Sequence, residues 1–138
     1  MLKVGDTFLL PPRPDVAEHL WIVLTRPDAK GEGICVNITS EDEDHTTELT
    51  VGDHPFVKHP SVVRYRNASS MNLQKIEDVI QGKLQLVGMV CKGHHPSSAA
   101  LLERVKEGLL KSPHTLKKFK LRCAAEWGVE WPPKKPKV

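Results

Sequence analysis

The chain has 138 residues, of which 39% are hydrophobic and 27% charged, and its formal net charge at pH 7 is +3. This length suits one domain with a single buried core. No run of 18 apolar residues occurs and the polar N-terminus lacks the apolar core of a signal peptide, so neither a transmembrane helix nor a membrane partner is expected. Three widely separated cysteines, Cys35, Cys91 and Cys123, favour reduced thiols in a cytoplasmic protein over a disulfide framework.

Short apolar runs bounded by turn residues predict a series of β-strands in the first half of the chain. The run His19–Thr25 is apolar almost throughout, so this strand should be central and covered on both faces. The acidic segment Ser40–His45 should be a loop that faces water, and Arg64 and Arg66 should share one face of the strand that contains them. The expected strands are Thr7–Leu10, His19–Thr25, Ile34–Thr39, Thr47–Val51 and Ser61–Arg66.

Capping residues and helical periodicity predict three helices in the second half of the chain, with one more strand between the first and the second. The expected elements are a helix over Leu73–Gln81 capped by Asn72, a strand over Leu84–Val90, a helix over Ala99–Leu110 capped by Ser97 or Ser98, and a helix over Pro113–Trp127. The residues expected in the core are Trp21, Ile22, Leu24, Val36, Ile38, Val63 and Val87.

The C-terminal part of the chain is basic. Residues 101–138 carry ten Lys or Arg and four Asp or Glu, whereas residues 1–100 carry ten and thirteen. In the last helix, the helical period should place Leu116, Phe119 and Cys123 against the core and leave the basic residues exposed. Such a basic end fits a nucleic-acid contact, an acidic-partner contact or a solvated tail. The basic side chains expected on its surface are Lys117, Lys118, Lys120 and Arg122.

Together these elements predict a mainly β protein with C-terminal helices, in which the strands form a small, strongly curved barrel. Residues 1–110 should form the barrel domain with a closing helix. Residues 111–138 should form a basic C-terminal helix and tail.

The segment Val51–Arg66 carries the densest set of chemically useful side chains. A carboxylate, two imidazoles, an ammonium and two guanidinium groups surround a short apolar strand. Acid, base and cation close together are what phosphodiester chemistry or anion binding requires, so a phosphate-facing site is one interpretation. The other is a turn at Gly52-Asp53 followed by loop histidines in water. The side chains concerned are Asp53, His54, Lys58, His59, Arg64 and Arg66.

Other chemistries have weaker support in the sequence. Cys91 and His94 have the spacing of half a zinc site, but no second half follows at a standard spacing, so neither a metal nor a cofactor is predicted. The chain has no phosphate loop, no Gly-x-Gly-x-x-Gly and no Gly-x-Ser-x-Gly. Cys35 lies in an apolar strand without an activating neighbour, which argues against a cysteine nucleophile.

Several short stretches resemble the MazF/PemK (Kid-like) toxin family, whose members are small SH3-like barrels. The resemblance covers residues 4–110 and implies the same fold. It also implies metal-independent endoribonuclease activity on RNA, an antitoxin partner and a homodimer. The stretches that carry it are Gly5-Asp6-Thr7-Phe8, His19–Thr25, Ile34–Ser40, Ser61-Val62-Val63, and Leu86-Val87-Gly88 followed by Ser97–Leu110.

The family's catalytic motif, Gln-x-Arg-Thr/Ser after a Ser-Val-Val strand, is only partly present. Asn67 matches the glutamine position, Ser70 matches the hydroxyl position, and Ser69 stands where the family has its arginine. The chain therefore departs from the family at the catalytic cation. Arg64 or Arg66 would have to replace it from the same strand.

Our hypothesis for the site assigns proton transfer to His54 and His59, with Asp53 orienting His54 and Arg64 and Arg66 clamping the phosphate. The alternative is a non-catalytic module that binds a protein or nucleic acid on the same barrel, with the basic C-terminal helix as its contact surface. The residues assigned to substrate binding are Lys58, Asn67, Ser70, Lys117, Lys118 and Lys120.

Overall fold

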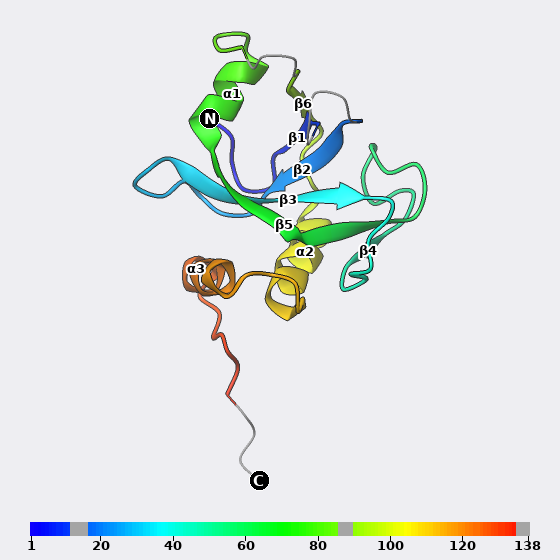
Figure 1. Cartoon of the computed structure of the whole chain (residues 1–138), viewed down its shortest axis with the longest axis vertical. Helices are drawn as coiled ribbons and strands as arrows, with labels where there is room; N and C mark the ends of the chain where they lie inside the picture. The colour runs from blue at the N-terminus through cyan, green and yellow to red at the C-terminus, as the bar shows by residue number, and fades with distance from the viewer. Residues whose placement is uncertain (12–16, 86–89, 135–138) are drawn as a thin grey trace.

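The computed structural model describes residues 1–11, 17–85 and 90–134. In this part of the chain six strands form one antiparallel sheet, in the order β4-β5-β3-β2-β1-β6. The sheet curls into a half-barrel, with α1 at one side and α2 and α3 at the other (Figure 1). The elements are β1 (Thr7–Leu10), β2 (His19–Val23), β3 (Glu32–Thr39), β4 (Glu48–Leu49), β5 (Ser61–Asn72), α1 (Leu73–Ile80), β6 (Lys92–His94), α2 (Ala99–Lys111) and α3 (Lys117–Trp127).

Strand β2 lies inside the sheet and is covered on both faces, as its apolar sequence predicted. Leu20 and Ile22 belong to a core cluster that includes residues of α2 and α3, whereas Trp21 and Val23 belong to a second cluster with Leu73 at the start of α1. Each fully buried Leu or Ile contributes about 1.5–3 kcal/mol through the hydrophobic effect. The expected core residues Trp21, Ile22, Leu24, Val36, Ile38 and Val63 are all buried.

Helix α2 approaches the sheet closely at Gly108. A side chain there would collide with Thr47 and with the ring of Tyr65, so the absence of a Cβ permits the contact. The Tyr65 hydroxyl donates to the Val105 carbonyl (2.8 Å) and lies 2.7 Å from Thr47 Oγ1. These bonds satisfy the polar end of a buried tyrosine and fix α2 against β5.

Helix α3 packs on the same core cluster through Cys123 and Phe119. The Trp127 indole donates to the Leu24 carbonyl (3.1 Å). The Arg122 guanidinium donates to the carbonyl of Arg26, in the β2–β3 connection, and to that of Glu32, the first residue of β3. The basic C-terminal helix is thus attached to the half-barrel by apolar contacts and by hydrogen bonds.

The helix caps were predicted correctly. Asn72 Oδ1 accepts from the Lys75 N–H (2.9 Å), and Ser98 Oγ accepts from the Leu101 N–H (3.1 Å). The start of the last helix was predicted wrongly, since α3 begins at Lys117 rather than at Pro113. Ser112 ends α2 instead of starting the next helix, and its hydroxyl donates to Asp44 Oδ2 (2.6 Å).

Two strand predictions need correction. Strand β5 continues to Asn72, so the positions matched to the family's catalytic motif lie within a strand. The last strand is β6, Lys92–His94. Of the expected strand Leu84–Val90, residues 86–89, including the expected core residue Val87, lie outside the described part of the chain, and Leu84, Gln85 and Val90 are not in a strand.

No helix in the described ranges has the length and the apolar content that a bilayer span requires.

Candidate functional site

A pocket of about 390 Å³ lies between the ends of β2 and β3 and the loop that precedes β5. It holds two of the predicted site residues, Lys58 and His59, and one that the sequence analysis missed, His19. Three residues with hydroxyl groups, Thr39, Ser40 and Ser61, also line it. The described residues that line it are Ala17, Glu18, His19, Ile38, Thr39, Ser40, Phe56, Lys58, His59 and Ser61.

His19 is held in one tautomer by Asn37. Asn37 Nδ2 lies 2.8 Å from His19 Nδ1, and an amide nitrogen only donates, so Nδ1 accepts and the neutral ring carries its proton on Nε2. Burial, and then the positive charge of Arg64, lower the pKa of His19 below its ordinary value of 6.5. At neutral pH His19 is therefore an uncharged N–H donor. The only feature of the sequence that pointed to His19 is that it is a polar residue at the start of an apolar strand.

His54 has a structural role. Its Nδ1 accepts from the Phe56 N–H (3.0 Å), so Nε2 carries the proton and donates to the His95 carbonyl (2.7 Å). The ring is buried and both nitrogens are bonded to the backbone. His54 thus ties its loop to the residues that follow β6, and it lies outside the pocket.

Asp53 does not orient His54, so that prediction is wrong. Its Oδ2 accepts from the Thr50 N–H (2.8 Å) and closes the turn before the loop. Its Oδ1 pairs with Arg104 Nη1 of α2 (3.1 Å). The carboxylate therefore joins the loop to α2.

Arg64 and Arg66 are paired with the acidic loop. Arg66 donates to Asp42 Oδ2 through Nε (3.1 Å) and Nη2 (2.8 Å), and its Nη1 pairs with Glu43 Oε1 (3.2 Å). Arg64 Nε lies 3.0 Å from the same Asp42 oxygen without an aligned hydrogen bond. The side chain of Asp42 is only 1% exposed, so the prediction that this loop faces water is wrong for this side chain.

Asp42 is ionised despite its position. Burial opposes ionisation, but the Asp44 N–H and the two arginines outweigh it and lower the pKa of Asp42. Asp44 is also buried, and its pKa is lowered, against burial, by hydrogen bonds from Ser112 and Thr46. The two aspartates anchor the loop to β5 and to the end of α2.

The other predicted binding residues do not line the pocket. Ser70 donates to Glu32 Oε1 (2.8 Å), and Asn67 is half-buried on β5. Lys117 and Lys118 are exposed as predicted, but Lys120 is only 9% exposed, with Nζ 5.3 Å from the centre of the Trp131 ring. Leu116, expected in the core, is 53% exposed. The basic face of α3 is therefore smaller than its sequence indicated.

The histidines near β6 form an aromatic cluster. The rings of His54 and His94 lie 5.0 Å apart, and Phe56 meets His94 edge-on at 6.1 Å. Burial first, then the charges of His54, His95 and Lys58, lower the pKa of His94. Within residues 1–11, 17–85 and 90–134 no three metal-ligating side chains gather as a metal site would require.

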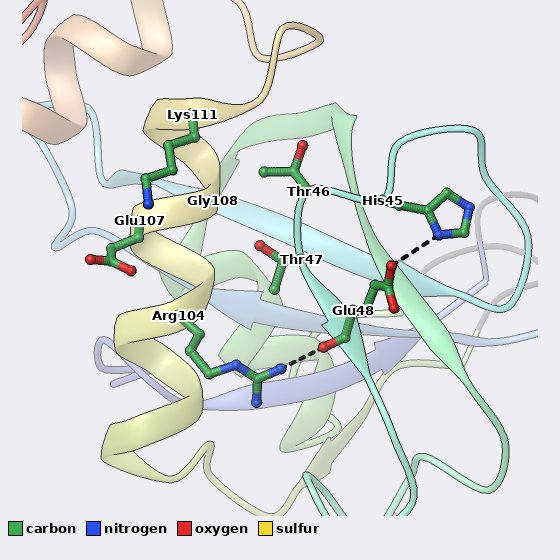
Figure 2. Close-up of a pocket in the computed structure, with 8 residues that line it drawn as sticks. All are labelled: His45, Thr46, Thr47, Glu48, Arg104, Glu107, Gly108 and Lys111. Atoms are coloured by element: carbon green, nitrogen blue, oxygen red, sulfur yellow. Dashed lines mark hydrogen bonds and ion pairs between the residues drawn. The ribbon is translucent and has the colours of Figure 1, made fainter.

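A second pocket of similar volume separates β4 from α2 (Figure 2). Its charged side chains have both signs. Arg104 bonds the Glu48 carbonyl and Asp53, and His45 Nδ1 lies 3.5 Å from Glu48 Oε1. The carboxylates of Glu48 and Glu107 balance the positive charges of Arg104 and Lys111 in the lining of this pocket.

Comparison of the sequence with protein-family models and with curated proteins finds no match. The fold and the pocket define a small β-rich protein with a histidine–lysine pocket. The resemblance to the MazF/PemK family remains a prediction.

Proposed function

We propose that this chain is an RNA-directed protein of the MazF/PemK type, built on an SH3-like barrel, and that its pocket binds a phosphodiester group. The observation that carries the proposal is the meeting of His19, Lys58 and His59 in one pocket. An ammonium group, imidazole N–H groups and hydroxyl groups are all donors to phosphate oxygens, and the charged donors form the strongest of these bonds.

The electrostatics of the pocket favour an anion. Lys58 and His59 are exposed, and the ion pairs of the described residues include neither of them. Among the described residues of the lining, Glu18 is the one carboxylate, and its Oε1 lies 4.0 Å from Lys92 Nζ. The charge of Lys58 is therefore available to a ligand.

The tautomer of His19 favours binding over cleavage. Cleavage of RNA without a metal requires a base for the 2′-hydroxyl and an acid for the leaving oxygen. The Nδ1 lone pair of His19 is taken by Asn37, so the neutral ring offers a donor rather than a base. A non-catalytic binding module, the alternative that the sequence left open, needs only such donors.

Endoribonuclease activity is the second candidate. One observation favours it: the pocket holds a second imidazole, His59, beside Lys58. His59 would transfer protons and Lys58 would stabilise the charge on the phosphorane. The family resemblance adds an antitoxin, a homodimer and a cytoplasmic location as parts of this proposal.

The experiment is a fluorescence-anisotropy titration of a labelled single-stranded RNA with the wild type and two double variants. Lys58→Ala/His59→Ala should bind at least about tenfold more weakly, because one charge-assisted hydrogen bond contributes about 1.5–3 kcal/mol. The matched control Lys30→Ala/His114→Ala removes the same groups from exposed positions outside the pocket and should bind like the wild type. Equal binding by all three proteins would refute the proposal. Gel analysis of the same RNA tests the second candidate, which requires cleavage that His59→Ala abolishes.

A further inference from the structure

Two guanidinium groups of β5 converge on one carboxylate oxygen. Arg66 Nε and Nη2 and Arg64 Nε all lie within 3.1 Å of Asp42 Oδ2, and Glu43 adds a second carboxylate at 3.2 Å from Arg66. Arginine binds the oxygens of a phosphate in the same forked geometry as those of a carboxylate. The acidic loop thus occupies a position that suits a phosphate.

The arginines lie beside the pocket on the sheet. Arg64 pairs in register with Asn37 of β3, and Asn37 bonds His19, which lines the pocket. The charge of Arg64 reaches His19, since it helps to lower the pKa of that ring. Arg66 lies two residues after Arg64 on the same face of β5, so the Cα atoms of the two arginines are about 7 Å apart. His19 and the buried Asn37 thus connect the wall of the pocket to Arg64 within the sheet.

The pairing leaves the arginine side chains partly exposed. The side chain of Asp42 is 1% exposed, but those of Arg64 and Arg66 are 35% and 40% exposed. Arg64 Nε itself is buried and has no aligned hydrogen-bond partner within the described part of the chain, so the exposure of Arg64 lies at its other atoms. Asp44, bonded to Ser112, holds the loop in place. The contact is thus stable, while the outer side of both arginines remains open to solvent.

We propose that Arg64 and Arg66 form a second anion subsite, for a neighbouring phosphate of the strand bound in the pocket, and that Asp42 and Glu43 block it from within the same chain. The inference rests on the proposed function, because it takes the ligand to be a phosphodiester strand. The acidic loop then acts as an autoinhibitory contact that limits the affinity for polyanions.

Neutralising the loop tests this inference. Asp42→Asn/Glu43→Gln should free two phosphate contacts. For a single strand, two contacts make the decrease of log affinity with log salt steeper by about 1.4, which corresponds to a gain of about 25-fold in RNA affinity at 0.1 M salt. The matched control Glu41→Gln/Glu103→Gln removes the same charge from exposed residues and should change the affinity little. An equal gain in the control, or no gain in the test variant, would overturn the subsite.

Two further variants keep the test decisive if the double variant folds poorly. Glu43→Gln alters a side chain that is 71% exposed and should still give about a fivefold gain, as one freed contact would. In the neutralised background, Arg66→Gln should remove one of the two freed contacts and reduce the gain from about 25-fold to about fivefold. If the pocket variant weakens binding and the loop variants do not strengthen it, the subsite fails alone. If RNA binds wild type and pocket variant equally, the proposed function fails.

Discussion

The basic side chains of the pocket and those of β5 belong to the same region of the sheet, yet their surroundings differ. Arg64 and Arg66 are paired with acidic residues that come more than twenty positions earlier in the sequence. Lys58 and His59 form no ion pair with any described residue and line a concavity. A basic residue is available to a ligand where the fold leaves its charge uncompensated; this condition is met in the pocket, whereas the acidic loop compensates the arginines of β5.

The largest expected effect is on stability, through Asp42. Asp42→Ala should lower the free energy of unfolding by about 3 kcal/mol, because it leaves two arginines facing each other without their shared partner. Lys58→Ala should change it by less than about 0.5 kcal/mol, since the side chain is exposed and unpaired. Urea unfolding followed by circular dichroism measures both. Equal losses of unfolding free energy in the two variants would contradict the difference between the paired arginines of β5 and the unpaired basic residues of the pocket.

A second contrast lies on α3. Arg122→Ala should cost about 2 kcal/mol, because its guanidinium satisfies the carbonyls of Glu32 and Arg26 and lies 3.6 Å from Asp28 Oδ2. Lys118→Ala, four residues earlier and exposed, should have almost no effect. Thermal unfolding of the two variants checks this. A shift in melting temperature for Lys118→Ala as large as for Arg122→Ala would contradict the account.

Acid should remove the stabilisation that the loop provides. The pKa of Asp42 is lower in the folded protein than its ordinary value of 3.8, so its contribution is present above that value and is lost as pH falls through the folded pKa. The difference in unfolding free energy between wild type and Asp42→Asn should therefore be constant near pH 7 and shrink below about pH 4. Unfolding titrations at several pH values measure it, and a difference that grows in acid would have the wrong sign.

The smallest expected effect comes from His19. Its pKa is lower in the folded protein than its ordinary value of 6.5, so the unfolded chain binds the proton more readily and stability falls as pH drops below that value. His19→Gln should remove this part of the pH dependence, which unfolding titrations between pH 7.5 and 5.5 measure. Identical pH profiles for the two proteins would show that His19 does not resist protonation.

The sequence predicted the parts of the structure that follow local rules. Alternation and apolar runs located the central strands and six of the expected core residues, and Asn72 and Ser98 act as the helix caps that their sequence context indicated. Lys58 and His59 do share a pocket. These outcomes depend on residues that are close in sequence or on one periodic face.

The predictions that failed depend on contacts between distant segments. His54 bonds the carbonyl of His95, 41 positions later, and Arg66 bonds Asp42, 24 positions earlier. Lys120 lies on the exposed side of its helix by periodicity, but the tail at Trp131 covers it. The path of a loop or a tail has no periodic signature, so the sequence could not show which polar residues were already bonded.

The most direct test of the central claim is an NMR titration of the imidazole resonances with a short single-stranded RNA. The account predicts saturable shifts of His19 and His59, both in the pocket, and unchanged signals from His45 and His114, which lie outside it. The Lys58→Ala variant should weaken the response of both pocket histidines. Shifts confined to His45 or His114, or no shift at His19 and His59 while the RNA binds, would contradict it.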